Sequence, residues 1–205
     1  MKYTAVGLGN IDAKLVFYIK NRPPLTSYKS LNCVKAIVPS EIAHICQETG
    51  NHWRKIFNVY AKLLFELSPK TFSSWQHLRD DFLLQAHSDN CLLFSAPCFL
   101  ATSHCKTGFL AHNSIESALP EPKAPDSKTL ISTTPKPVKK LHVILGKGYA
   151  EQLGLCYDCT WLSHDFAINN ELGIIICPYF DYRQLSNIKI VQLAALIRQL
   201  TATGA

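Results

Sequence analysis

The sequence lacks the long apolar segments of membrane and secreted proteins. No run of about 18 apolar residues occurs in its 205 residues, and the first ten, MKYTAVGLGN, lack the apolar stretch of about 7 to 15 residues found in a secretion signal. Charged residues make up only 18% of the chain, and no block of five or more basic residues appears. We therefore expect a cytoplasmic protein with no membrane partner.

Common catalytic and phosphate-binding motifs are also missing. There is no G-x-S-x-G nucleophile elbow, and Gly7-Leu8-Gly9 precedes a strand, whereas a dinucleotide fingerprint follows one. Asp80 and Asp81 are neighbours on an expected helix and would point about 100° apart, which suits solvated charges better than a shared acid/base site. No catalytic residue can be assigned, and no cofactor is predicted.

The apolar content is sufficient for one sizeable core. Hydrophobic residues make up 47% of the chain, and 205 residues suit one large domain better than two small ones. We expect residues 1–205 to form a single α/β domain with a Pro-rich connection at about residues 116–140, where five prolines stand among Ser, Thr and Lys. The formal net charge of +6 permits a polyanionic partner without requiring one.

Strand-like and helix-like segments alternate along the chain. Strands are expected at residues 14–19, 91–94, 108–111, 141–145 and 173–177, and helices at residues 41–49, 52–67, 74–86, 149–155 and 188–200. Ser40 and Ser74 are suitable N-caps, and the last helix is expected to bury Ile188 and Val191 within its apolar face. Because the connections are too long for hairpins, we expect a three-layer α/β sandwich: a mostly parallel central sheet with helices on both faces.

The eight cysteines leave three interpretations. Most have apolar neighbours, as Cys177 does after Ile176, which favours free thiols packed in the core of a protein in a reducing compartment. Cys156 and Cys159 form a C-x-x-C pair that could ligate zinc if two loops met and supplied further ligands from Cys98, His104, Cys105 and His112. A redox role would place the pair at a helix N-terminus, whereas it follows a helix-like stretch. Structural thiols are favoured, and no metal site is assigned.

Two turns at expected strand ends carry candidate ligand-binding residues. Gly146-Lys147-Gly148 lies between a strand and a helix, where backbone N–H groups and the Lys147 ammonium can face a phosphate; an ordinary tight turn is the alternative. The turn after Cys177 contains Pro178, Tyr179, Asp181 and Arg183, which can stack on a flat ligand and pair with an anion, or can pack beneath the last helix. Because ligands of open α/β sheets bind beyond the carboxyl ends of the strands, we expect the site at these turns.

Over roughly residues 91–200, the order of elements resembles that of the uracil-DNA glycosylase superfamily. The matching stretches are FSAPCF (residues 94–99), LAHN (110–113), LGKGYA (145–150) and CPYF (177–180). The resemblance implies the α/β fold and adds Pro97, Phe99 and Asn113 as candidates, since a flipped base could stack on Phe99 and hydrogen-bond to Asn113. That family's first loop carries a water-activating Asp or Asn, where this chain has Ser95 and Ala96. Its last loop begins His-Pro-Ser, where this chain has Cys-Pro-Tyr, so the resemblance implies binding without hydrolysis.

We therefore expect a protein of glycosylase-like architecture that binds DNA, another nucleic acid or a nucleotide-like ligand. The candidate ligand-binding residues are Pro97, Phe99, Asn113, Gly146, Lys147, Pro178, Tyr179, Asp181 and Arg183. Two alternatives stay open. One is an interaction or structural protein that uses the Pro-rich connection as its contact surface. The other is a hydrolase using His112, His164 or Asp181, for which no triad geometry can be inferred.

Overall fold

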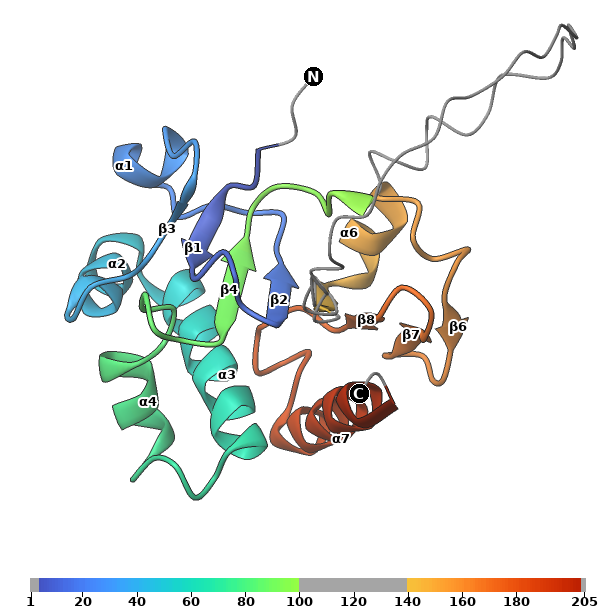
Figure 1. The fold of residues 1–205 in the computed structure, drawn as a ribbon. Coiled ribbons are helices and arrows are strands. Elements are labelled where there is room, and N and C mark those ends of the chain that lie inside the picture. The colour runs from blue at the N-terminus through green and yellow to red at the C-terminus, as the bar shows by residue number, and fades with distance from the viewer. Residues whose placement is uncertain (1–3, 100–139, 204–205) are drawn as a thin grey trace, which may run out of the picture.

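The computed structural model describes residues 4–99 and 140–203 (Figure 1). The strands are β1 Gly7–Gly9, β2 Leu15–Tyr18, β3 Val34–Lys35, β4 Asn90–Leu93, β5 Leu141–Leu145, β6 Thr160–Trp161, β7 Ala167–Asn169 and β8 Ile174–Cys177. The helices are α1 Thr26–Lys29, α2 Glu41–Thr49, α3 Asn51–Leu67, α4 Trp75–Asp81, α6 Lys147–Gln152 and α7 Asn187–Thr203. The strand expected at residues 108–111, and all but the last residue of the Pro-rich connection, lie outside the described residues. None of the described helices is long and apolar enough to cross a membrane.

Eight strands form one mixed sheet in the order β3-β1-β4-β2-β5-β8-β7-β6. Its centre is parallel, because β2 pairs in parallel with both β4 and β5, and β5 pairs in parallel with β8. Antiparallel pairs join β1 to β4 on one side and β8, β7 and β6 on the other. The expected mostly parallel α/β sheet is therefore confirmed. The outer strands β1, β3, β6 and β7 were missed because each has only two or three residues, too few for a periodic signal.

Both faces of the sheet are covered by packed side chains. Phe17 and Ile19 belong to an apolar cluster shared with α2, α3, α4 and α7, whereas Val16 and Tyr18 belong to a second cluster shared with α6. Figure 1 shows α3 and α7 on one side of the sheet and α6 on the other. The central strands are apolar at consecutive positions because alternate residues enter opposite clusters.

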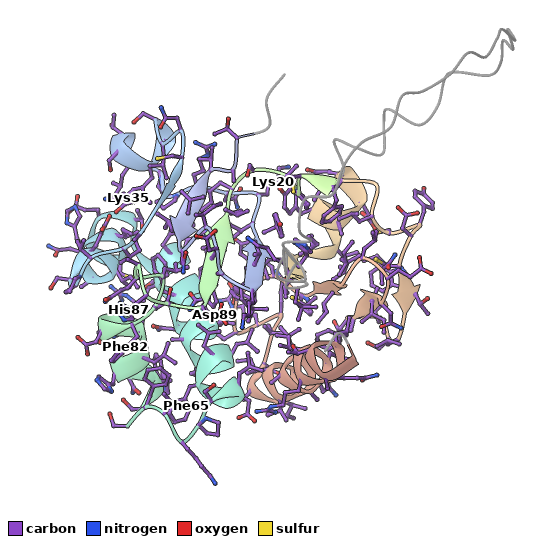
Figure 2. The ribbon with its side chains drawn as sticks, in the orientation of Figure 1. Lys20, Lys35, Phe65, Phe82, His87 and Asp89 are labelled. Atoms are coloured by element: carbon purple, nitrogen blue, oxygen red, sulfur yellow. The ribbon has the colours of Figure 1, made fainter. Side chains whose placement is uncertain are left out.

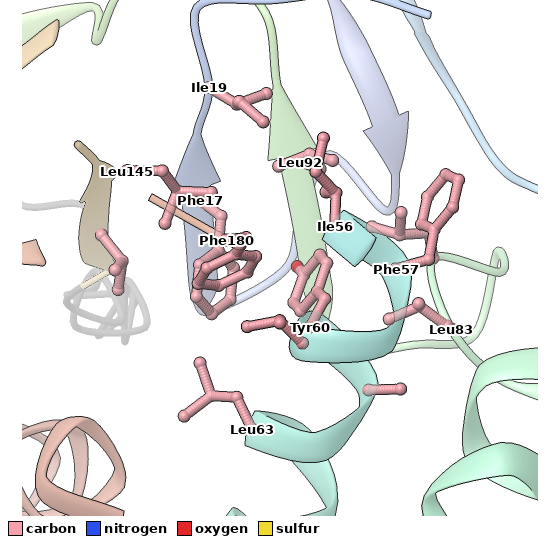
Figure 3. Packing of buried hydrophobic residues seen from close by; sticks show 14 of the residues in the cluster. Phe17, Ile19, Ile56, Phe57, Tyr60, Leu63, Leu83, Leu92, Leu145 and Phe180 are labelled. Atoms are coloured by element: carbon pink, nitrogen blue, oxygen red, sulfur yellow. The ribbon is translucent and has the colours of Figure 1, made fainter. Parts of the chain in front are cut away.

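The amphipathic helix expected at residues 52–67 is confirmed as α3, which begins one residue earlier, at Asn51. Its sheet-facing residues, spaced by three and four positions, are at most 1% exposed: Trp53, Ile56, Phe57, Tyr60 and Leu63. Figure 3 shows this surface packed against Phe17, Leu92 and Phe180. The Tyr60 ring centroid lies 4.5 Å from that of Phe17 and 5.5 Å from that of Phe180. Burying each large apolar side chain stabilises the fold by about 1.5–3 kcal/mol, so α3 anchors the centre of the sheet.

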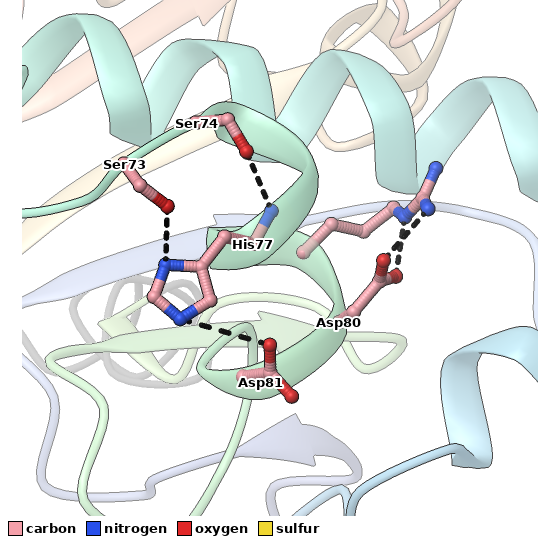
Figure 4. A network of polar contacts seen from close by, with 6 residues as sticks. Ser73, Ser74, His77, Asp80 and Asp81 are labelled. Atoms are coloured by element: carbon pink, nitrogen blue, oxygen red, sulfur yellow. Dashed lines mark hydrogen bonds and ion pairs between the residues drawn. The ribbon is translucent and has the colours of Figure 1, made fainter.

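Of the two expected serine N-caps, Ser74 caps α4 and Ser40 does not cap α2. The Ser74 hydroxyl accepts a hydrogen bond from the His77 N–H at 3.1 Å, at the start of α4 (Figure 4). Ser40 lies instead in the left-handed region, at φ 70°, and its side chain makes no cap. The Glu41 carboxylate closes this turn by accepting from the Val38 N–H at 3.1 Å. The expected Ser40 cap was therefore wrong, because a residue in that conformation does not present its hydroxyl to the helix.

Helix α4 ends at Asp81, earlier than the sequence indicated. Leu83 and Leu84 are both fully buried, and Leu84 reaches the core with a φ of 58°. A right-handed helix requires a negative φ at every residue, so it cannot continue through Leu84. Asp80 pairs with Arg79 at 2.7 Å and Asp81 lies 3.7 Å from His77, both at the surface (Figure 4). The interpretation of Asp80 and Asp81 as solvated helix charges is confirmed.

Helix α7 buries most of the apolar face expected from the sequence, including Leu193, Ala194, Ile197 and Leu200, but exposes two of its residues. Ile188 is 75% exposed and Val191 is 51% exposed, although both were assigned to the buried face. The buried residues of this helix are Ile190, Leu193, Ala194, Ile197 and Leu200. The helix is apolar on more than one side, so sequence periodicity could not fix which side faces the core.

Candidate functional site at the carboxyl edge of the sheet

The parallel strands β2, β4, β5 and β8 all end at one edge of the sheet, which we call the carboxyl edge. The segments that leave this edge are residues 19–22 after β2, 94–99 after β4, 146–147 after β5 and 178–183 after β8. Two of these turns contain most of the candidate ligand-binding residues. The four segments leave the sheet in the same direction because the strands are parallel.

Gly146 and Tyr179 bring the turns after β5 and β8 into contact. The Gly146 N–H donates to the Cys177 carbonyl at 2.9 Å, and Gly146 has a φ of +99°, a conformation that favours glycine. A Cβ placed at residue 146 would lie 3.7 Å from the Tyr179 ring, in ordinary van der Waals contact. The glycine is therefore explained by its backbone conformation and not by a lack of space.

Tyr179 is partly buried against the core and reaches the start of α3. Its hydroxyl lies 3.0 Å from Nε2 of His52, and the two ring centroids are 5.9 Å apart. Burial raises the pKa of Tyr179, and the Asp181 carboxylate acts in the same direction, while a hydrogen bond with Asn21 opposes them. The neutral phenol can therefore donate or accept a hydrogen bond at neutral pH, and it holds the turn against α3.

Asp181 organises the rest of this turn through hydrogen bonds. Its carboxylate accepts from the Arg183 N–H at 2.9 Å and pairs with the Lys55 ammonium at 3.1 Å. The Arg183 hydrogen bond, followed by Lys55, lowers the pKa of Asp181. Lys55 also lies 4.9 Å from the centroid of the exposed Tyr182 ring. Asp181 therefore stays ionised and positions cationic and aromatic groups, an arrangement that does not suit a general acid at neutral pH.

Lys147 and Pro178 line a small pocket of about 260 Å³ on the side of β6 and β7. The Lys147 ammonium lies 4.6 Å from the centroid of the Trp161 ring. Lys189 and Asp165, which also line the pocket, form an ion pair at 2.9 Å, and His164, Cys177 and Gln184 complete the lining. Tyr179 does not line this pocket, so the two turns offer adjacent surfaces and not one enclosed cleft.

The remaining candidates lie elsewhere or outside the described residues. Pro97 is buried, and the Phe99 ring packs against His142 with centroids 5.0 Å apart, on the face of the sheet that α6 covers. Asn113 is not among the described residues. The structure therefore brings Gly146, Pro178 and Tyr179 together, places Lys147 beside them, and puts Phe99 on a different surface.

The C-x-x-C pair has the properties of structural thiols. Burial raises the pKa of both Cys156 and Cys159, to about 11 for Cys159, so neither is held as a reactive thiolate. Within residues 4–99 and 140–203, no three His, Cys, Asp or Glu side chains are grouped so that they could hold a metal ion. Three of the ligands considered for zinc, His104, Cys105 and His112, lie outside these ranges. The cysteines of the described part are all free.

His52 and Lys55 belong to this site, and the sequence analysis missed them. They lie in the first turns of α3 and reach Tyr179 and Asp181, respectively. A usable signal existed, because a helix that returns antiparallel to parallel strands must begin at their carboxyl edge. The polar residues in its first turns, turned away from the apolar stripe, were therefore available to the site.

A model of one protein family matches residues 6–128 and 116–198, which together span most of the chain. The chain belongs to the family of unknown function DUF6942. No curated protein and no solved structure matches it. The family description assigns no ligand or reaction, so the function has to be argued from the residues of the site.

Proposed function

We propose that this chain binds nucleic acid at the carboxyl edge, with a nucleotide-like anion as its smallest ligand, and does not hydrolyse it. The contact between the turns after β5 and β8 carries the proposal. It sets the turn that carries Lys147 beside the turn that carries Tyr182 and Arg183, and the Lys55 ammonium lies 4.9 Å from the centroid of the Tyr182 ring. Cations beside exposed aromatic rings favour a phosphate backbone with unpaired bases.

The charge at this edge favours an anionic ligand. Two acids at this edge, Asp165 and Asp181, are each paired with a lysine, at 2.9 and 3.1 Å. Arg183 after β8 and Lys20 after β2 are exposed cations beyond these two pairs. The edge therefore has surplus positive charge, which attracts phosphate groups in a salt-dependent manner.

Pocket size favours a strand bound along the surface over a nucleotide enclosed in a cleft. The pocket beside Lys147 measures about 260 Å³. Pockets that enclose a small ligand typically measure about 300–1,000 Å³. A phosphate or sugar fits the smaller volume, and a base would stack outside it on Tyr182, which is 54% exposed.

Binding without hydrolysis follows from the groups that stand at the expected catalytic positions. Ser95 occupies the position of the water-activating residue, and its hydroxyl accepts from the Val6 N–H at 3.2 Å. Cys177 occupies the histidine position, where it is buried and donates from Sγ to the Ile144 carbonyl at 3.7 Å. Burial raises the pKa of this thiol, so it supplies no base. A glycosylase-like architecture and a cytoplasmic location are parts of this proposal.

Fluorescence anisotropy with labelled single- and double-stranded DNA and RNA tests the proposal. The unmodified chain should bind at low salt and dissociate as salt is added, and Arg183→Ala should weaken binding and reduce the slope of log Kd against log salt by about one. Lys70→Ala is the matched control, because Lys70 is an exposed cation beyond the end of α3, far from the carboxyl edge. The proposal fails if no probe binds at low salt, or if Lys70→Ala weakens binding as much as Arg183→Ala.

A further inference from the structure

A cavity of about 1280 Å³ lies at the opposite edge of the sheet, where the central strands begin. It is bounded by Leu15 and Leu141 at the starts of β2 and β5, by the end of α3, by α4, and by the last turns of α7. Figure 2 shows Phe82, His87 and Asp89 on this side of the sheet and Lys20 on the other. The cavity is therefore separate from the carboxyl edge.

The cavity has apolar walls that residues 4–99 and 140–203 cover only partly. Leu64, Leu67 and Phe72 line it and are each half-buried, although all three pack against the main core. Phe82, also half-buried in the lining, packs on Phe72 with ring centroids 5.1 Å apart. Protein interiors are close-packed, and apolar concave surfaces of this size mark sites where an apolar molecule binds. The length of the wall, from the sheet to the far ends of α3 and α7, suits an extended molecule.

The rim of the cavity carries more positive than negative charge. Lys14 and Lys140 precede adjacent strands, and the Leu141 N–H donates to the Lys14 carbonyl at 2.8 Å, so the two lysines are neighbours. Arg198 is a third cation in the lining, and its guanidinium pairs with the Glu66 carboxylate at 3.9 Å. The acid in the lining, Asp89, accepts from the Lys14 N–H at 2.8 Å. A ligand with one anionic end and an apolar body matches this distribution.

We propose that this cavity binds a free long-chain acyl anion, with its hydrocarbon chain against α3 and α4 and its carboxylate at the lysine rim. The apolar wall supplies most of the binding free energy, because each buried methylene contributes about 0.8 kcal/mol, or about fourfold in affinity. The lysines supply orientation and a preference for an anion over a neutral alcohol. This site is independent of the proposed nucleic-acid site.

Isothermal titration with dodecanoate, kept below its micelle concentration, tests the inference, with dodecanol as the neutral comparison. Leu67→Trp fills the cavity and should weaken dodecanoate binding at least about tenfold, since several methylenes lose their contacts. Val191→Trp is the matched control, because Val191 is exposed on the outer side of α7. Lys14→Gln should weaken dodecanoate about two- to fivefold, the range for an exposed ion pair, and leave dodecanol unchanged. Thermal unfolding of each variant verifies that it is folded.

Several results would overturn the inference. Absence of dodecanoate binding by the folded chain would refute the site, and unchanged binding in folded Leu67→Trp would place the ligand elsewhere. Equal loss of dodecanoate and dodecanol in Lys14→Gln would refute the role of the lysine rim. Concentration-dependent self-association that Leu67→Trp abolishes would show that a second copy of the chain occupies the cavity. Nucleic-acid binding should be unchanged in Leu67→Trp, so the two proposals can fail separately.

Discussion

Protonation of His142 is expected to destabilise the fold as the pH falls. His142 is the second residue of β5, its Nδ1 lies 2.8 Å from the Tyr18 hydroxyl, and its ring packs against Phe99. Burial lowers the pKa of His142 to about 4, and the nearby Lys140 ammonium acts in the same direction. The same group in an unfolded chain has a pKa of about 6.5. The folded state therefore binds fewer protons than the unfolded state between these two values.

The sign and size of the effect follow from this difference in proton binding. Neutral His142 contributes to the free energy of unfolding. This contribution is fully present above about pH 6.5, decreases as the pH falls, and is lost once the pH is below about 4. Each unit of pKa difference corresponds to about 1.4 kcal/mol, so the full loss is about 3 kcal/mol, with about 2 to 3 kcal/mol gone by about pH 4.5. That is a large part of the 5–15 kcal/mol that stabilises a typical domain.

Urea unfolding followed by tryptophan fluorescence, at about pH 7 and about pH 4.5, measures this contribution. His142→Gln removes the titrating group. On acidification from about pH 7 to about pH 4.5, the free energy of unfolding of this variant should therefore fall by about 2 to 3 kcal/mol less than that of the unmodified chain. His44→Gln, at an exposed position of α2, is the matched control and should show the unmodified pH dependence. The reasoning is refuted if His142→Gln loses as much stability on acidification as the unmodified chain.

Three further substitutions test the packing and capping of the fold, each by chemical denaturation at neutral pH. Ser74→Ala should lower the free energy of unfolding by about 1 kcal/mol, because the His77 N–H loses its cap; a loss near zero would show that the cap is unimportant. Phe180→Ala should lower it by about 3–5 kcal/mol, because the ring is fully buried; a loss under 1 kcal/mol would contradict that packing. Gly7→Ala should lower it by about 3 kcal/mol or more, or abolish soluble expression. The new Cβ would overlap the Leu92 carbonyl oxygen, and a variant as stable as the original would refute that close approach.

Tertiary contacts decided the details that the sequence left open. The sides of the sheet are built from two- and three-residue strands that pair only because longer strands stand beside them. Ile188 and Val191 are exposed because the orientation of α7 depends on which surface of the sheet it meets. His52 and Lys55 joined the site because α3 packs antiparallel to the central strands, a contact between residues more than 100 positions apart. The cavity of about 1280 Å³ where the central strands begin likewise combines segments from both ends of the chain.

Sequence alone determined the class of the fold and the two turns at its carboxyl edge. Apolar runs predicted the strands, connections too long for hairpins predicted that they are mostly parallel, and the spacing of Ile56, Phe57, Tyr60 and Leu63 predicted α3. These patterns depend on residues close together in the chain. The sequence also placed Gly146 and Tyr179 at strand ends. Their contact with one another, and the assignment of Phe99 to the other face, depended on how the strands align side by side. Strand order is set by the packing of the whole core, so only the tertiary structure could decide it.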